Sequence, residues 1–316
     1  MTDYLYPGSV EEAVAHLMAY DGQARVIAGG TDVMPDIRKR KIHPRALVDV
    51  TRIPGLDQIK VTEGAAGASF VEVGAAVTFA AIQGSPFLGQ HVHALTEAAR
   101  SVGAAAIQNV ATWVGNIVQA MPAADGAIVA VALEAGARVV DAQGAEWRTV
   151  ASLFDGPGLS AIDPSRQVVT HIRFVSPEPL CGTAWRRIGR RPSLVLPILN
   201  CAVKLCLARE GGHIEGACVA LGPVAPRPFR ASGAETFLRG RPPTMEAFAQ
   251  AARIAQEEAD PRTSPRRASR EYRLAIIPSL VTEALAVAAK RAGAPPQSTN
   301  LPTHQSTNLP THQTIV

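Results

Sequence analysis

The sequence predicts an α+β fold in two domains, and two observations carry this prediction. Up to about residue 177, short strand-like runs, small helices and glycine turns mix without the regular βαβ repeat of a doubly wound sheet. Beyond residue 182, three strand-like segments come first and two long helical segments follow, which favours a sheet with helices packed on one face. The run Ser176-Pro177-Glu178-Pro179 separates the two patterns and is interpreted as the domain boundary.

The first helix and the elements that follow it can be assigned from local signals. Ser9 and Glu12 form a capping box before an apolar helical face, and this helix is expected to end near residues 21–22. Strands are expected over residues 24–28 and 46–50, as a pair within 59–77, and over 138–141. Helices are expected after Thr78 as far as residues 84–86, over residues 90–102, and from Pro122 onward.

The second half continues with longer elements. Strands are expected over residues 183–188, 195–209 and 213–222, and helices over residues 244–259 and 271–291. The tail contains one octapeptide twice, at residues 297–304 and 305–312. Two short polar copies cannot build a solenoid, so residues 293–316 are expected to be flexible.

Composition limits the class of protein. With 316 residues, of which 47% are hydrophobic and 18% charged, the chain can bury a substantial core. Its longest apolar stretch, residues 127–140, is interrupted by Glu134 and Arg138 and is shorter than the roughly 20 residues that a bilayer span needs. The N-terminus lacks the basic start and apolar run of an export signal. We therefore expect a soluble cytoplasmic protein with no membrane span.

The net charge of +4 does not by itself indicate nucleic-acid binding. Much of the excess lies in residues 38–41 and 262–273, and the second segment carries five arginines but a single aromatic residue, Tyr272. The stacking platforms that bases require are therefore missing. A solvated helix face or a contact with an acidic partner protein explains the second segment more simply, and no nucleic acid is expected.

The cysteines and histidines predict no metal site and no catalytic residue. Cys181, Cys201, Cys206 and Cys218 have neither C-x-x-C spacing nor a neighbouring histidine pair. We interpret them as small buried thiols in a reducing compartment, and we expect no iron–sulfur cluster in this chain. The eight histidines form no Ser/His/Asp or metal-binding arrangement.

Two glycine-containing loops are the most informative motifs. One runs from Val26 to Val33, and the other from Thr112 to Asn116 with Asp125 behind it. Each follows an apolar run, where free backbone N–H groups can face an anion such as a pyrophosphate. The first loop does not match the Rossmann G-x-G-x-x-G pattern, and taken alone it is more simply a structural turn. Asp125 would repel a diphosphate, so it either accepts hydrogen bonds from ribityl or ribose hydroxyls or caps the helix begun at Pro122.

Together the loops resemble those of the FAD-binding medium subunits of molybdenum hydroxylases, the xanthine dehydrogenase and carbon monoxide dehydrogenase family. The second loop reads Ala111-Thr112-Trp113-Val114-Gly115-Asn116-Ile117, where the family pattern is Ala-Thr-x-Gly-Gly-Asn-Ile. Val114 therefore adds a Cβ and two methyl groups where the family has a glycine. Further segments in family order are residues 45–59, 170–173, 186–194, 220–228 and 268–273, so the similarity extends to about residue 292.

The resemblance implies a fold and domain limits. It implies a two-part PCMH-type FAD-binding domain, similar to that of vanillyl-alcohol oxidase, followed by an α+β C-terminal domain with a small antiparallel sheet and helices. The expected limits are residues 1–177 for the FAD-binding domain, with subdomains of about 1–55 and 56–177, and residues 182–292 for the C-terminal domain. The tail would comprise residues 293–316.

The resemblance also implies which residues bind the cofactor. The pyrophosphate would be held by Val26, Ile27, Ala28, Gly29, Gly30, Thr31, Asp32 and Val33. The remaining phosphate and ribityl oxygens would be bound by Thr112, Gly115, Asn116 and Asp125. Val102 would lie against the adenine or the ring system, and Thr170 and Arg186 would approach the isoalloxazine. A cation at the N1 and O2 edge stabilises the reduced flavin anion, a role open to Arg186, whose simpler interpretation is a strand-surface cation.

The implied function is that of an FAD-carrying electron-transfer subunit of a molybdenum hydroxylase or dehydrogenase. Substrate would be oxidised at a molybdenum cofactor on a large partner subunit, and electrons would reach FAD through the [2Fe-2S] clusters of a small partner subunit. The expected assembly is a dimer of heterotrimers that passes electrons to a terminal acceptor. The four-cysteine loop of members that reduce hydroxybenzoyl-type thioesters is not reproduced. The alternatives are a stand-alone FAD-dependent oxidase or dehydrogenase and a scaffold subunit that has lost FAD.

Overall fold

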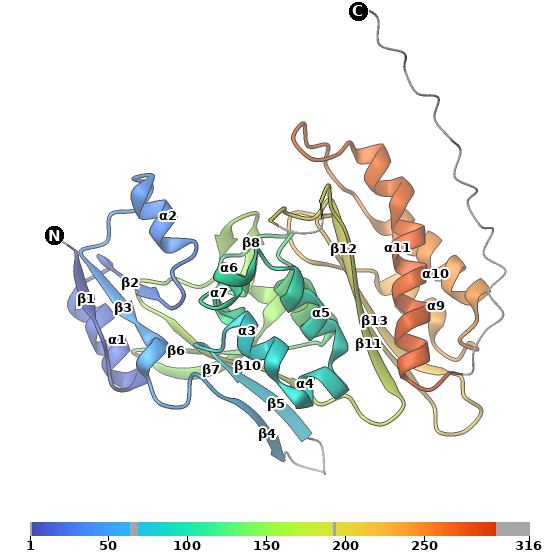
Figure 1. Cartoon of the computed structure of the whole chain (residues 1–316), viewed down its shortest axis with the longest axis horizontal. Coiled ribbons are helices and arrows are strands. Elements are labelled where there is room, and N and C mark those ends of the chain that lie inside the picture. Colours follow the sequence, from blue (N-terminus) through green and yellow to red (C-terminus); the bar gives the residue numbers. More distant parts are fainter. Residues whose placement is uncertain (1, 64–68, 192–193, 295–316) are drawn as a thin grey trace, which may run out of the picture.

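The computed structural model describes the chain except for residues 1, 64–68, 192–193 and 295–316, and it confirms the α+β fold. Figure 1 shows a small parallel sheet at one end, a larger antiparallel sheet in the middle and a third sheet covered by long helices at the other end. The predicted repeat tail lies outside the described residues.

The N-terminal part is a three-stranded parallel sheet with one helix packed against it. Its strand order is β1 (Asp3–Leu5), β3 (Ala46–Asp49) and β2 (Ala24–Ile27), and its helices are α1 (Val10–Ala19), α2 (Val33–Arg38) and the 3-10 turn η1 (Val50–Arg52). Ser9 caps α1 as predicted, because its side chain accepts a hydrogen bond from the Glu12 N–H. The Glu12 carboxylate, however, accepts from the Gly8 N–H at 2.6 Å.

The middle part is built on a five-stranded antiparallel sheet. The strand order is β4 (Ile59–Glu63), β5 (Ser69–Gly74), β10 (Val168–Val175), β6 (Gly136–Asp141) and β7 (Gly144–Thr149). The helices are α3 (Phe79–Gly84), α4 (Pro86–His91), α5 (His93–Ser101), α6 (Ala105–Gln108), α7 (Trp113–Val118) and α8 (Asp125–Ala132). The 3-10 turn η3 (Val150–Leu153) leads into the short hairpin of β8 (Phe154–Gly156) and β9 (Leu159–Ser160).

Helix starts in this part were predicted with mixed success. Thr78 caps α3 as predicted. Ser85 caps a further helix, α4, which begins where α3 was expected to end and which was not predicted as a separate helix. The prediction that Pro122 opens a helix is wrong, because α8 begins at Asp125. Ala124 before it has extended backbone, and its N–H closes a turn on the Met121 carbonyl, so Pro122 lies in that turn.

The C-terminal part is a four-stranded antiparallel sheet covered by helices. The strands are β11 (Cys181–Ile188), β12 (Leu199–Leu207), β13 (Ile214–Gly222) and β14 (Phe229–Arg230), and the helices are α9 (Ser232–Leu238), α10 (Met245–Glu258) and α11 (Arg270–Arg291). The helices cover one face of the sheet, and α5 and α8 of the middle part contact the other (Figure 1). The sheet therefore contributes to two hydrophobic cores. Most of its buried side chains belong to the C-terminal core, and Trp185, Ala202 and Ala220 join the core that the N-terminal and middle parts share.

Helix α11 is the one described helix that is long and apolar enough to cross a membrane by length and composition alone. Eight of its side chains are buried, and it packs against α10, β11 and β12. The contact with β11 requires glycine, because a Cβ on Gly182 would lie 2.0 Å from the Ala288 carbonyl oxygen. Packing within the C-terminal core therefore accounts for the apolar composition of α11.

The prediction of four free thiols is wrong for two cysteines. Cys181 and Cys206 are direct partners in the β11–β12 ladder, with a Cα–Cα distance of 4.0 Å, and they form a disulfide. Cys201 and Cys218 are free and buried, as expected. Burial raises the pKa of the Cys218 thiol to about 12 and that of Cys201 well above its usual range. Strand register, which sequence spacing does not reveal, decides which cysteines meet.

We predict that thiol counting will separate these two classes. In the native protein near neutral pH, an aromatic disulfide reagent should modify neither Cys201 nor Cys218, because buried thiols with raised pKa values form little thiolate. Denaturation without reductant should release two thiols, and denaturation after reduction should release four. Four thiols in the denatured, unreduced protein would contradict the disulfide.

Candidate functional site

Both glycine-containing loops line a single cavity of about 750 Å³. The first loop joins β2 to α2, and the second leads from α6 into α7. The remaining wall includes residues from the β8–β9 hairpin and from the segment before β10. A volume of this size lies within the range of sites for small molecules and cofactors.

The two loops meet at Gly29. A Cβ built on Gly29 would lie 1.8 Å from the Val110 carbonyl oxygen and 3.0 Å from the Ala111 Cα. No side chain fits at this distance, so only glycine allows the first loop to approach the backbone that leads into the second. Gly30 is needed for a different reason, because its φ of +67° lies in the left-handed region.

The second loop is fixed from both sides. Thr112 caps α7, where its Oγ1 accepts from the Gly115 N–H at 3.1 Å. The Ala111 carbonyl accepts from the Phe79 N–H at 3.0 Å, and the indole N–H of Trp113 donates to the Gly126 carbonyl at 2.9 Å. The hydroxyl of Thr112 is therefore already used as an acceptor by its own helix.

Two polar atoms at the cavity lack partners among the described residues. Asn116 Oδ1 is buried without a donor, and Arg25 Nε is buried without an acceptor. Burial lowers the pKa of Arg25, an effect opposed by Asp36 and Asp163, and burial together with Asp36 raises the pKa of Asp32. A guanidinium N–H of Arg25 without an acceptor, the Asn116 amide oxygen without a donor and the backbone of the glycine loops together fit a ligand that carries both phosphates and hydroxyl groups.

Eleven of the fifteen predicted binding residues line this cavity. They are Val26, Ala28, Gly29, Gly30, Thr31, Asp32, Val33, Val102, Thr112, Gly115 and Asn116. Val114 also lines it and is only 4% exposed, so its side chain forms part of the wall. The sequence analysis did not select Arg25, although an arginine inside the short strand Ala24-Arg25-Val26-Ile27 was a usable signal.

Four predicted residues lie outside the cavity lining. Ile27 is buried beneath the first loop, within van der Waals reach of Gly30. Thr170 is fully buried in β10, where its hydroxyl donates to the Arg138 carbonyl at 3.4 Å. Arg186 pairs with Glu283 at 2.6 Å and lies 3.7 Å from Glu97.

Asp125, the fourth, joins the two domains. Its Oδ2 accepts from the Ser101 hydroxyl at 3.0 Å and lies 3.5 Å from Arg187 Nη1, while its Oδ1 accepts from the Asn200 amide. Burial raises the pKa of Asp125, and Arg187, Asn200 and Ser101 oppose that rise.

Among the described residues, no group of three or more histidine, cysteine or acidic side chains could hold a metal ion.

Comparisons with known proteins show both the class of protein and the family, a class of flavoprotein that the fold and the cavity fit. Residues 1–176 match the FAD binding domain in molybdopterin dehydrogenase, and residues 184–288 match the CO dehydrogenase flavoprotein C-terminal domain. The chain belongs to this family, so it is an FAD-dependent oxidoreductase subunit, as the sequence resemblance indicated.

Similar proteins span nearly the whole chain. The medium chain of carbon monoxide dehydrogenase from Hydrogenophaga pseudoflava is 28% identical over 92% of this chain and 97% of its own length. The nicotinate dehydrogenase FAD-subunit of Eubacterium barkeri is 29% identical over 77% of this chain and 81% of its own length. A solved structure of carbon monoxide dehydrogenase from Hydrogenophaga pseudoflava superimposes with a TM-score of 0.83 at 29% identity, covering 92% of this chain and 98% of that one.

Replacing Asp125 should test its role between the domains. Asp125→Asn leaves Arg187, whose side chain is 7% exposed, without its carboxylate, so we expect the free energy of unfolding to fall by about 3 kcal/mol. The control is Glu134→Gln, which removes the interdomain ion pairs to Lys204 and Arg230 at a carboxylate that is 54% exposed. Here the loss should be about 1 kcal/mol or less. Urea denaturation measures both, and equal losses would contradict the assignment.

Proposed function

We propose that this chain holds FAD in the cavity between its two glycine-containing loops and relays electrons from an iron–sulfur partner to a terminal acceptor. The observation that carries the proposal is the approach of Gly29 to the Val110 carbonyl, which brings both loops to one cavity of about 750 Å³. When bound, FAD supplies electron transfer in steps of one or two electrons.

The two loops are proposed to bind different parts of the cofactor. Backbone N–H groups of Gly29, Gly30 and Thr31 would face the diphosphate, and Arg25 would supply the opposing positive charge. Asn116 Oδ1 would accept a hydrogen bond from a ribityl hydroxyl.

The four predicted residues outside the lining are proposed to act indirectly. Ile27 supports the first loop from below, and Thr170 fixes β10 against β6. Asp125 holds the C-terminal domain in place through Arg187 and Asn200, and Arg186 does so through Glu97, while its pair with Glu283 lies within the C-terminal domain.

The valine in the second loop does not argue against FAD. Val114 is part of a wall around a cavity that remains about 750 Å³ in volume, so its side chain narrows the site without filling it. This supports a cofactor-carrying subunit over a scaffold that has lost FAD.

The proposed partners are a large molybdopterin-binding subunit and a small iron–sulfur subunit, assembled as a dimer of heterotrimers in the cytoplasm. The names of two relatives support this assembly. One is a medium chain and the other an FAD-subunit, and both names designate one component of a larger enzyme. Solved structures that this chain resembles include those of carbon monoxide dehydrogenase and quinoline 2-oxidoreductase.

Removing the positive charge at the cavity should weaken FAD binding. Arg25→Gln should raise the Kd for FAD roughly tenfold or more, because a hydrogen bond to a charged group contributes about 1.5–3 kcal/mol. Arg38→Gln, an exposed arginine on α2 outside the lining, is the matched control and should leave the Kd unchanged. Titration of FAD into the apoprotein of each variant measures the two Kd values. Equal affinities in folded variants would place FAD elsewhere.

Co-expression should test the proposed assembly. With a molybdopterin-binding and an iron–sulfur subunit from the same genome, the chain should co-purify as a complex containing two copies of each subunit. Light scattering and metal analysis of the purified complex measure this. A stable monomeric flavoprotein that oxidises an organic donor by itself would instead support the stand-alone oxidase.

A further inference from the structure

A second hollow lies at the junction of the two domains, separate from the FAD cavity. It has a volume of about 630 Å³ and is lined by α5, β11 and residues 189–191 after β11. It shares no lining residue with the FAD cavity, although Ser101 of the groove directly precedes Val102 of the cavity. We call this hollow the arginine groove, because five arginines line it: Arg100, Arg186, Arg187, Arg190 and Arg191.

The arginine groove has an excess of positive charge. Glu97, the only acidic residue among the described residues that line it, is already engaged at both oxygens, because Oε1 pairs with Arg291 and Oε2 accepts from the Trp185 N–H at 3.0 Å. Arg186 lies 3.7 Å from Glu97 and also pairs with Glu283. The other exposed arginines of the groove, Arg100, Arg190 and Arg191, pair with no carboxylate in the part of the chain that the structure describes.

Two buried donors at the groove lack acceptors. Trp185 and Arg187 are alternate residues of β11, so their side chains lie on the same face of the strand. Trp185 is 8% exposed and the Arg187 side chain 7%, and neither Trp185 Nε1 nor Arg187 Nε has an acceptor among the described residues. A buried donor left without a partner costs about 1–3 kcal/mol, so both atoms indicate a missing acceptor.

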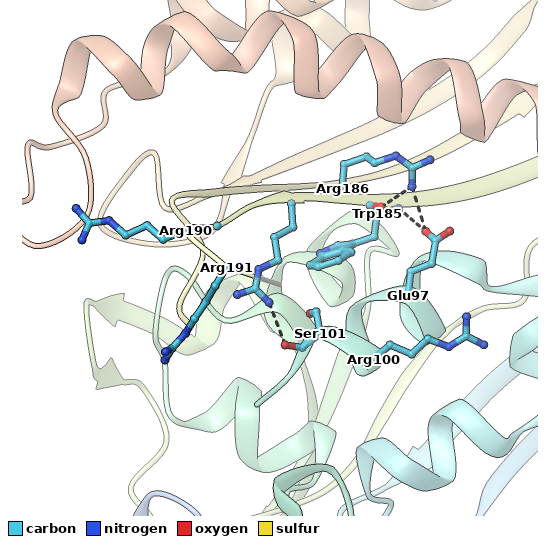
Figure 2. Close-up of a pocket in the computed structure, with 9 residues that line it drawn as sticks. Glu97, Arg100, Ser101, Trp185, Arg186, Arg190 and Arg191 are labelled. Carbon is cyan, nitrogen blue, oxygen red and sulfur yellow. Dashed lines mark hydrogen bonds and ion pairs between the residues drawn. The ribbon is translucent and has the colours of Figure 1, made fainter. Parts of the chain in front are cut away.

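The Arg187 guanidinium is held in place by its other nitrogens. Nη1 donates to the Ser101 carbonyl at 2.9 Å and lies 3.5 Å from Asp125, and Nη2 donates to the Val195 carbonyl. Figure 2 shows the Trp185 indole at the centre of the groove, with Arg190 and Arg191 on one side and Arg100 on the other. The Arg187 guanidinium is therefore fixed, and the long cationic side chains of Arg100, Arg190 and Arg191 form the walls of the groove.

We infer that the arginine groove binds a small molecule through an oxyanion, a phosphoryl or carboxylate group, that accepts hydrogen bonds from Trp185 Nε1 and Arg187 Nε. Arg100, Arg190 and Arg191 balance its charge, since guanidinium groups match the geometry of both oxyanions. The volume is that of a small-molecule site, and the single aromatic residue in the lining offers no series of stacking platforms for nucleic acid. The inference does not depend on the proposed FAD site.

The test is anion binding to the full chain, with and without added FAD. Pyrophosphate and citrate are titrated separately while tryptophan fluorescence and binding heat are recorded, so the two arms distinguish phosphoryl from carboxylate ligands. We expect saturable binding of at least one, with a Kd that rises with salt concentration. Trp185→Phe should abolish the fluorescence change and weaken binding roughly tenfold or more, because a hydrogen bond to a charged acceptor contributes about 1.5–3 kcal/mol.

Charge variants locate the bound anion. Arg100→Glu with Arg190→Glu should weaken binding more than tenfold, whereas Arg253→Glu, an exposed arginine on α10, should leave it unchanged. Arg25→Gln, at the FAD cavity, should also leave it unchanged. The inference is overturned by the absence of saturable binding, by equal affinity in the double variant, or by binding that is lost with Arg25 and displaced by FAD.

Discussion

The cavity depends on one backbone approach, that of Gly29 to the carbonyl oxygen of Val110. At a distance that would leave 1.8 Å between a Cβ and that oxygen, any side chain would force the first loop away from the segment leading into α7. The wall of the cavity would then open between two parts of the chain that are 81 residues apart in sequence. This constraint is steric, so it operates whether or not a ligand is present.

The C-terminal domain completes the molecule through a second close approach. A Cβ on Gly222 would lie 2.4 Å from the Pro122 carbonyl oxygen, and next to it Asn200 and Arg187 engage Asp125 at the start of α8. Buried polar contacts of this kind fix one geometry, because a shifted arrangement leaves charged groups unpaired. The C-terminal sheet is thus docked against α5 and α8.

Local chemistry explains which features the sequence alone could predict. The caps at Ser9 and Thr78, the helix expected over residues 244–259, the strands and the glycine-containing loops depend on neighbouring residues, and the structure contains them close to the expected positions. The Cys181–Cys206 disulfide depends on strand register. The partners of Asp125 depend on how two domains pack, so a carboxylate beside a glycine loop could not be told apart from an interdomain anchor. Spacing carries no information about either contact.

The cavity between the glycine-containing loops and the arginine groove come close at residues 101–102, since Ser101 lines the groove and Val102 lines the cavity. Arg187 donates to the Ser101 carbonyl, and the Leu194 N–H donates to the Gly103 carbonyl at 3.2 Å, so the turn after β11 is tied to the segment that carries Val102 into the cavity. Cations near a flavin stabilise its reduced, anionic form. With FAD in the cavity and an oxyanion in the groove, as proposed above, the anion would weaken this stabilisation, so the two proposals together imply electrostatic coupling between the sites without any change in the fold.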